Sequence, residues 1–367
     1  MDLPRRLLLD VGPAVGGDGS RGIGRYVRGL VRAIGEWSPE RQERVWAVGL
    51  PGPTLDAFGG RGIEERPLGI RPVDLGWLLG PRALGRAARK SGASVFHATD
   101  PHRPWRPRDM KLIVMAYDLI PLLDAALFAS WRPHHRLVYK SYLRQLQVAD
   151  TIVAISRTTA ADLATHLGIS DERVRIVYPA VRRPATSPRS PASEPTFLYV
   201  GALDSHKQPE LAVQALAHYR EREHERAARL RFIGPSSQAQ RNRLLEQAGR
   251  FGIADHLQFD GWIPDAALDA AFSTATALLL TSRIEGFGLP AVEAALRGIP
   301  VIAVDTPAAR ETVGTIAMLT PQDAEAIAAA MASPRAPDAA ALEELAERFS
   351  TGAAADALAS VYEAALL

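Results

Sequence analysis

Cysteine is absent from this 367-residue chain. Its absence excludes disulfide bonds, zinc–thiolate sites and thiol nucleophiles, and it fits a reducing compartment. Long apolar runs are also missing, because no stretch approaches the roughly 18 apolar residues that a membrane-spanning helix needs. The apolar run from Leu7 to Leu9 is too short for the hydrophobic region of a signal peptide. We therefore expect a cytoplasmic protein whose membrane contact, if any, is peripheral and at the inner face of the membrane.

Acidic side chains are scarce in the first half of the chain. Residues 1–190 carry 29 Lys and Arg against 18 Asp and Glu, whereas residues 191–367 carry 14 against 23. A positive excess favours an anionic partner, such as a phospholipid surface or a lipid diphosphate. A solvated arginine-rich surface explains the same count equally well, so both interpretations stay open. Nucleic-acid binding is not indicated, because no recognisable module with interleaved aromatic residues is present.

Groups of metal ligands are missing as well. The sequence has no Asp-x-Asp pair between predicted strands, and no His/Asp cluster has the spacing of metal ligands. We therefore predict no metal site.

Short apolar runs rich in β-forming residues alternate with helical patterns along the chain, which is typical of parallel α/β architecture. Two series of strands are predicted. The first series is Arg6–Val11, Val45–Leu50, Ser94–Ala98, Leu112–Ala116, Thr151–Ile155 and Val174–Val177. The second is Phe197–Val200, Leu230–Ile233, Leu257–Phe259, Ala277–Leu280 and Val301–Val304.

The length and the two series predict two Rossmann-like domains. The first covers residues 1–180 and the second residues 196–350. Residues 181–195 have the composition of a linker, with prolines at 184, 188, 191 and 195. The alanine-rich amphipathic pattern at 351–367 predicts a last helix that crosses back to the first domain.

The most specific segment runs from Glu285 to Glu293 and reads EGFGLPAVE. It directly follows the predicted strand Ala277–Leu280. Pro290 suits the first turn of a helix, where its missing N–H costs nothing, and Gly286 and Gly288 let the backbone approach a ligand closely. Free N–H groups at the start of a helix attract anions, so the segment predicts an anion site.

Two carboxylates flank this predicted site. Acidic groups beside a bound diphosphate would repel it, so Glu285 and Glu293 are expected to face neutral hydroxyls, for which a carboxylate is a natural bidentate acceptor. We assign Glu285 to a transferred sugar and Glu293 to the ribose of a nucleotide. The competing interpretation of Glu293 is a carboxylate that only complements the helix dipole, an effect of about 0.3–1 kcal/mol.

A second glycine-rich segment follows the first predicted strand. Gly22 and Gly24 lie between that strand and a helix predicted from Ile23, where a phosphate or sugar could meet a helix amino terminus. Glycines are also common in surface loops, so a lone Gly-x-Gly is a weak signal. We favour Gly22 and Gly24 as residues of close approach to a ligand.

The Glu-x₇-Glu pattern, followed by GIPVI at residues 298–302, resembles the signature of the family-4 retaining glycosyltransferases of the GT-B fold. The resemblance extends over nearly the whole chain. Its other parts are Gly22–Tyr26, Tyr117–Leu122, Val200–Gly201 with Lys207, Gly234, and Phe259–Pro264.

The resemblance implies an acceptor-side amino-terminal domain and a carboxyl-terminal domain that binds a nucleotide sugar, with two parallel sheets facing an interdomain cleft. It also implies transfer of a hexose with retention at the anomeric carbon, without a metal or resident cofactor. The nucleotide diphosphate sugar is the co-substrate, and the resemblance favours GDP-mannose. A growing glycan or a polyprenyl-diphosphate-linked glycan is the implied acceptor.

The same resemblance assigns roles to individual residues. Glu285 and Lys207 would be catalytic, with the ammonium stabilising the departing nucleoside diphosphate. The donor-binding set is Gly22, Gly24, Gly201, His206, Gly234, Ile263, Arg283, Gly286, Phe287, Gly288, Leu289 and Glu293. The acceptor or sugar side would consist of His97, Tyr117 and Asp118. His97 is expected at the end of a strand, directed toward the cleft, and a half-buried structural histidine is the competing interpretation.

Two positions depart from the family pattern. Many members have an arginine where this chain has Ala202, and His206 or Arg283 could supply the second positive charge instead. Many members also have a histidine where this chain has Tyr117. A tyrosine still donates a hydrogen bond, but it titrates far from neutral pH, which argues against acid–base use of this position.

Three other functions compete with a transferase. A nicotinamide-dependent oxidoreductase also has Rossmann-like halves, but it would carry a third glycine where this chain has Val27. A non-catalytic sugar-nucleotide-binding protein is suggested by Ala202 and Tyr117. A nucleotide-sugar epimerase of the same fold would alter or release the sugar without an acceptor.

Overall fold

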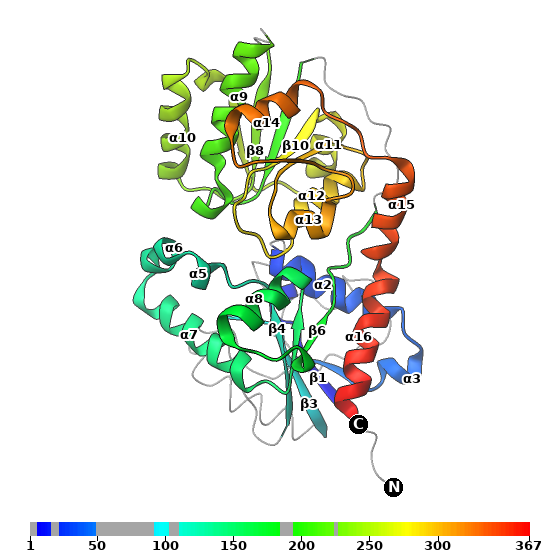
Figure 1. Ribbon diagram of the computed structural model, residues 1–367. Helices are drawn as coiled ribbons and strands as arrows, with labels where there is room; N and C mark the ends of the chain where they lie inside the picture. Colours follow the sequence, from blue (N-terminus) through cyan, green and yellow to red (C-terminus); the bar gives the residue numbers. More distant parts are fainter. Residues whose placement is uncertain (1–5, 16–21, 49–91, 103–109, 184–193, 224–226) are drawn as a thin grey trace. The chain divides into compact units, whose positions relative to one another are not determined.

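The computed structural model describes residues 6–15, 22–48, 92–102, 110–183, 194–223 and 227–367 (Figure 1). The chain divides into two compact units, one formed by residues 1–181 and 349–367 and the other by residues 182–348. Most of the predicted linker, residues 184–193, lies outside the described residues. The predicted interdomain cleft stays a prediction.

The first unit is built on a six-stranded parallel sheet with the strand order β2-β1-β3-β4-β5-β6. Its strands are β1 (Arg6–Asp10), β2 (Val45–Val48), β3 (Ala93–Ala98), β4 (Lys111–Ala116), β5 (Thr151–Ala154) and β6 (Val174–Ile176). Its helices are α1 (Gly12–Val15), α2 (Gly22–Gly35), α3 (Pro39–Gln42), α5 (Ile120–Leu123), α6 (Ala125–Ser130), α7 (Pro133–Val148), α8 (Arg157–Leu167), η2 (Asp171–Arg173) and α16 (Thr351–Leu366).

The second unit contains another six-stranded parallel sheet, with the order β12-β11-β10-β7-β8-β9. Its strands are β7 (Thr196–Val200), β8 (Arg229–Ile233), β9 (Leu257–Gly261), β10 (Ala277–Leu280), β11 (Val301–Val304) and β12 (Met318–Thr320). Its helices are η3 (Ser205–Lys207), α9 (Pro209–Arg222), α10 (Gln238–Arg250), η4 (Ala254–His256), α11 (Asp265–Thr274), α12 (Leu289–Ala295), α13 (Pro307–Val313), α14 (Ala324–Ala332) and α15 (Ala339–Arg348).

The predicted strands are confirmed, with ends that differ by at most two residues, except that the predicted end of Val45–Leu50 lies outside the described residues. Central strands such as β10 and β11 are continuous apolar runs buried at every position, as expected for a parallel sheet covered on both faces. The sequence analysis missed β12, because three residues at a sheet edge are too few to form a recognisable pattern.

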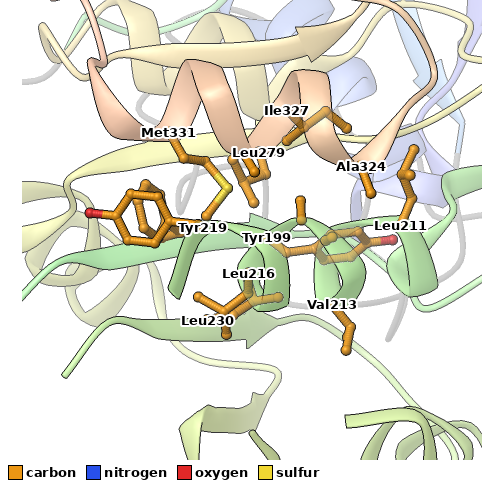
Figure 2. Close-up of a cluster of buried hydrophobic side chains, with 14 of the residues drawn as sticks. Tyr199, Leu211, Val213, Leu216, Tyr219, Leu230, Leu279, Ala324, Ile327 and Met331 are labelled. Carbon is orange, nitrogen blue, oxygen red and sulfur yellow. The ribbon is translucent and has the colours of Figure 1, made fainter. Parts of the chain in front are cut away.

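The core of the second unit lies between its sheet and the helices α9 and α14 (Figure 2). Side chains from β7, β8 and β10 meet side chains from both helices there, and the labelled members include Tyr199, Leu216, Leu279, Ile327 and Met331. This packing makes the sheet a rigid support for the loops that leave its carboxyl edge.

The carboxyl-terminal helix α16 packs on α2, β1 and β3 of the first unit. The Trp37 indole N–H donates to the Ala355 carbonyl at 3.1 Å, and Arg41 pairs with Glu363 at 2.9 Å. Tyr362 is 2% exposed and edge-on to the Trp37 ring. The end of the chain is therefore part of the first unit.

The strand order of each sheet reverses beside the first strand of its unit, between β1 and β3 and between β7 and β10. In open parallel sheets, ligands bind outside the carboxyl ends of the strands at such a reversal point, because the two flanking loops diverge there. Because β7 and β10 are neighbours in the second sheet, the loops that follow them start side by side at this point.

The backbone is tightly packed along this carboxyl edge. The Gly201 N–H donates to the Ile233 carbonyl, and the Gly234 N–H donates to the Gly261 carbonyl, both at 2.8 Å. Gly234 has a φ of 144°, and a Cβ added to it would lie 2.2 Å from the Gly201 carbonyl oxygen. Only glycine fits at this crossing of two chain segments.

Replacing Gly234 with alanine is therefore expected to destabilise the protein by about 2 kcal/mol or more, through overpacking and backbone strain. Urea unfolding monitored by circular dichroism measures the change. Gly249→Ala is the matched control, because Gly249 lies in α10 and an added Cβ meets nothing within 4 Å. Alanine there should stabilise the helix by about 0.5–1 kcal/mol. Equal stability of the two variants would contradict the packing argument.

Candidate functional site

Hydrogen bonds join the loop after β7 to the loop after β10. The Thr281 hydroxyl lies 2.8 Å from the Lys207 carbonyl oxygen and 2.9 Å from that of Gln208. The Arg283 N–H donates to the His206 carbonyl at 2.9 Å. These bonds hold together two segments that are more than 70 residues apart in the sequence.

The joined loops place Lys207 against Glu285. The Lys207 ammonium donates to Glu285 Oε1 at 2.6 Å, and the Ser282 hydroxyl donates to the same oxygen at 2.7 Å. The side chains of Lys207 and Glu285 are only 24% and 10% exposed. The two residues predicted to be catalytic therefore form one partly buried, hydrogen-bonded ion pair.

The environment of Glu285 keeps its carboxyl group ionised. Burial raises the pKa of Glu285, but the Lys207 charge, the hydrogen bonds from Lys207 and Ser282, and the charge of His206 together bring the pKa below its usual 4.5. An ionised carboxylate accepts hydrogen bonds and does not donate a proton near neutral pH. Glu285 is thus suited to holding hydroxyl groups.

The rest of the EGFGLPAVE segment leads into α12. Gly286 and Phe287 are buried, and Gly288 precedes the helix with a left-handed φ of 83°. Leu289 is half-buried at the first position of α12, and no side chain caps this helix end. The segment thus has the predicted form, a glycine turn that opens a helix with a proline in its first turn.

The roles predicted for the remaining donor-side residues stay predictions. Those of the second unit lie in loops, turns or short helices at the carboxyl edge of its sheet, and Glu293 is half-buried on α12. Gly201 and Gly234 directly follow β7 and β8, and Ile263 is half-buried two residues after β9. His206 is 6% exposed, whereas the Arg283 side chain is exposed.

The predicted glycine loop of the first unit is partly corrected. Gly22 and Gly24 lie in the first turn of α2, so they are helical residues, while residues 16–21 lie outside the described residues. Gly24 is buried, and a Cβ added to the exposed Gly22 meets nothing within 4 Å. The protein itself thus imposes no steric need for glycine at position 22.

His97 has the form of the competing interpretation, a buried structural histidine, and its predicted place on the sugar side stays a prediction. Its side chain is fully buried on β3, and Nδ1 lies 2.7 Å from the Tyr362 hydroxyl on α16. Burial lowers the pKa of His97 to about 3, so the ring is neutral. His97 is a core residue that helps to hold the last helix on the sheet.

Tyr117 is also a core residue. It is 7% exposed, its hydroxyl donates to the Thr99 carbonyl at 2.8 Å, and its ring is edge-on to Tyr26. The expectation that this hydroxyl donates to a sugar is therefore corrected, because its hydrogen is already used. The half-buried Asp118 accepts from the Ile120 N–H at 3.0 Å and so supports the start of α5.

The sequence analysis missed Thr281 and Ser282, which hold the ion pair. Two hydroxyl residues between a buried strand and the Glu285 motif were the available signal. Their partners could not be inferred, because Lys207 and Gln208 are brought to them only by the sheet topology.

Within the described ranges, no group of three or more His, Cys, Asp or Glu side chains is placed to hold a metal ion. Likewise, none of the helices in these ranges has both the length and the apolar character needed to cross a bilayer.

Two protein-family models match the chain. Residues 20–183 match the model for Glycosyltransferase Family 4, and residues 185–353 match the model for glycosyl transferases group 1. Together the two matches take in both units.

Two curated proteins are similar to parts of the chain. A D-inositol 3-phosphate glycosyltransferase from Acidothermus cellulolyticus is 31% identical over 170 residues, which are 42% of this chain and 38% of that protein. The serotype-specific mannosyltransferase WbdA from Escherichia coli is 25% identical over 238 residues, which are 61% of this chain and 28% of that protein. The chain thus spans well under half the length of these relatives.

The solved structure of Anabaena HepE in complex with UDP and glucose has a similar fold. It superposes with a TM-score of 0.68 at 17% sequence identity, covering 98% of this chain and 100% of that one.

Removal of the ammonium should make the stability of the protein respond differently to pH. Without Lys207, the largest of the effects that offset burial of Glu285 is lost, so its pKa in the folded protein should rise above the usual 4.5. The destabilisation should then become smaller as the pH falls toward this raised pKa. Lys207→Met should therefore destabilise the protein by about 2 kcal/mol at pH 7 and by less at pH 5.

Urea unfolding at both pH values checks this expectation. Arg250→Met is the matched control, because Arg250 forms an exposed pair with Glu246 on α10 and its loss should have a small, pH-independent effect. A Lys207→Met effect that is the same at pH 7 and pH 5 would refute the electrostatic account of the pair.

Proposed function

This chain belongs to the family-4 glycosyltransferases of the GT-B fold, and we propose that it transfers a hexose from a nucleotide diphosphate sugar to a glycan or lipid-linked acceptor, with retention at the anomeric carbon. The observation that carries the proposal is the Lys207–Glu285 pair at the reversal point of the second sheet. A cation and a carboxylate at one point match the two chemically different parts of such a donor, an anionic diphosphate and a neutral sugar.

The pair suggests how the donor is bound. A diphosphate entering the site offers Lys207 an anion with more charge than Glu285 carries, so the ammonium turns to the phosphate oxygens. Glu285 is then free to accept hydrogen bonds from the sugar hydroxyls. After the exchange the ammonium faces an anion and the carboxylate keeps hydrogen-bond donors, which limits the cost of desolvation.

The same arrangement supplies transition-state stabilisation. Negative charge develops on the leaving diphosphate oxygen as the glycosidic bond breaks, and a fixed ammonium in a partly buried site interacts more strongly with that charge than with the ground state. The buried His206 lies in the same short helix as Lys207 and is one of the groups that lower the pKa of Glu285. We propose on this basis that the chemistry is metal-independent.

We propose GDP-mannose as the donor. Support comes from similarity to a protein named a mannosyltransferase, while the similar HepE structure contains UDP and glucose. A thermal-shift screen against GDP-, UDP- and dTDP-sugars tests the choice, because a ligand that binds only the folded state raises the melting temperature. A larger shift with UDP-glucose than with GDP-mannose would overturn the choice of donor.

Glu285→Gln should reduce kcat about 100-fold or more. A neutral amide oxygen accepts hydrogen bonds less well than a carboxylate, and the amide NH2 group is a donor facing sugar hydroxyls that need an acceptor. The substitution is nearly isosteric, so the fold should be retained. The measurement is sugar transfer from the donor that gives the largest thermal shift. Glu246→Gln on the exposed face of α10 is the matched control and should be fully active.

Full activity of Glu285→Gln would rule out the proposed role of Glu285. Assays of the wild-type protein also distinguish a transferase from the competing functions. Donor binding without turnover across an acceptor panel identifies a sugar-nucleotide-binding protein. Conversion of the sugar in the absence of an acceptor identifies an epimerase.

The first unit offers a surface for peripheral contact with an anionic membrane. Residues 125–148, which include α6 and α7, contain four Lys and Arg and no Asp or Glu. On α7, Lys140 and Arg144 are exposed, and Leu137 on the same side is 63% exposed. Basic residues attract anionic lipids, and an exposed apolar side chain adds to binding at a membrane surface. We propose that this basic face of α7 contacts the membrane that carries the acceptor.

The double variant Lys140→Gln/Arg144→Gln should bind phosphatidylglycerol vesicles at least about tenfold more weakly, at roughly 1 kcal/mol per basic residue. Vesicle co-sedimentation at constant salt measures the binding. The variant Lys111→Gln/Arg182→Gln removes the same charge from other exposed positions and should bind like the wild type. Equal losses in the two variants would point to net charge and against the α7 surface.

A further inference from the structure

We propose that Thr281 and Ser282 are positioning residues that hold the Lys207–Glu285 pair in its reactive arrangement, one through the backbone and the other through the carboxylate. This inference rests on the proposed function and adds two residues to the site. Both hydroxyls stand at the end of β10, and their side chains are 1% and 3% exposed.

Thr281 holds the backbone that carries Lys207. Its hydroxyl lies 2.8 and 2.9 Å from the carbonyl oxygens of Lys207 and Gln208, so one hydrogen is shared between two acceptors. Gln208 has a φ of 49°, and it is the one residue other than glycine in the described ranges with a positive φ. Residues with a side chain rarely adopt this conformation, because it costs free energy. The Thr281 hydrogen bond to the Gln208 carbonyl helps to hold it. The Thr281 hydroxyl, at the end of β10, thus holds the turn that directs Lys207 toward Glu285.

Ser282 holds the carboxylate itself. Its hydroxyl and the Lys207 ammonium both donate to Oε1 of Glu285, at 2.7 and 2.6 Å. Two donors on one oxygen fix the plane of the carboxylate and leave Oε2 to accept a hydrogen bond from a ligand. When the ammonium turns to the donor diphosphate, the Ser282 bond remains, so Glu285 keeps its place.

The two hydroxyls therefore have separable effects. Loss of the Thr281 hydroxyl frees the backbone of Lys207, which should weaken stabilisation of the departing diphosphate and lower kcat. Loss of the Ser282 hydroxyl removes a hydrogen bond to ionised Glu285, which should raise the pKa of that carboxyl group. The Arg283–His206 backbone hydrogen bond persists in both variants, so the two loops stay joined.

The decisive variants are Thr281→Val, which keeps the shape and loses the hydroxyl, and Thr281→Ser, which keeps the hydroxyl. Thr320→Val is the matched control, because Thr320 is also buried at a strand end of the same sheet and its hydroxyl reaches the Ala303 carbonyl at 3.4 Å. We expect kcat to fall about tenfold in Thr281→Val, to stay within about twofold of the wild type in Thr281→Ser, and to be unchanged in Thr320→Val. The KM for the donor should change less than kcat in Thr281→Val.

A second measurement does not depend on turnover. Carboxyl-carbon NMR follows the titration of Glu285, whose pKa should rise in Ser282→Ala and stay at the wild-type value in Thr320→Val. The inference is overturned if Thr281→Val has the kcat of Thr320→Val, or if Ser282→Ala leaves the Glu285 titration unchanged. A wild-type chain without transferase activity defeats only the proposed function, because the NMR titration then decides the role of Ser282.

Discussion

The hydrogen-bonded ion pair between Lys207 and Glu285 is the interaction on which the candidate site depends. Taking two charges out of water is costly, and their attraction offsets that cost only where the geometry is good and other donors complete the hydrogen bonding. Ser282 provides such a donor, and the shared Thr281 hydroxyl fixes the backbone beneath the ammonium. Because Ser282 also donates to Glu285, the pair can open when a ligand binds. The ammonium can then bind the anionic part of the ligand while the carboxylate accepts hydrogen bonds from its hydroxyl groups.

The same edge of the sheet combines tight packing with reactivity. Gly201 and Gly234 lie where two chain segments cross at the ends of β7 and β8, and the crossing leaves no room for a side chain at position 234. Beside them, β7 and β10 are neighbours at the reversal of strand order, and the two loops that follow these strands meet there and carry the ion pair. Rigid backbone crossings next to a charged pair limit how far the charges can move, and electrostatic stabilisation depends on that rigidity.

The first unit shows how often polar residues in a core serve the fold. His97 and Tyr117 both resembled ligand-contacting residues in the sequence, yet His97 Nδ1 lies against the Tyr362 hydroxyl and the Tyr117 hydroxyl donates to the Thr99 carbonyl. Buried polar groups must be hydrogen-bonded, and a sequence does not reveal whether the partner is protein or ligand. The basic outer face of α7 is the opposite case, since its charge and exposure follow from composition and helical periodicity.

The sequence by itself determined the alternating strands and helices and the glycine turn that opens α12. These features are local, because hydrophobic periodicity, glycine and proline act over a few residues. The tertiary structure alone decided that Lys207 pairs with Glu285, that Thr281 reaches two carbonyls in another loop, and that His97 lies beneath the last helix. Each of these contacts joins segments far apart in the chain, and only the order of the strands and the packing of the helices bring such segments together.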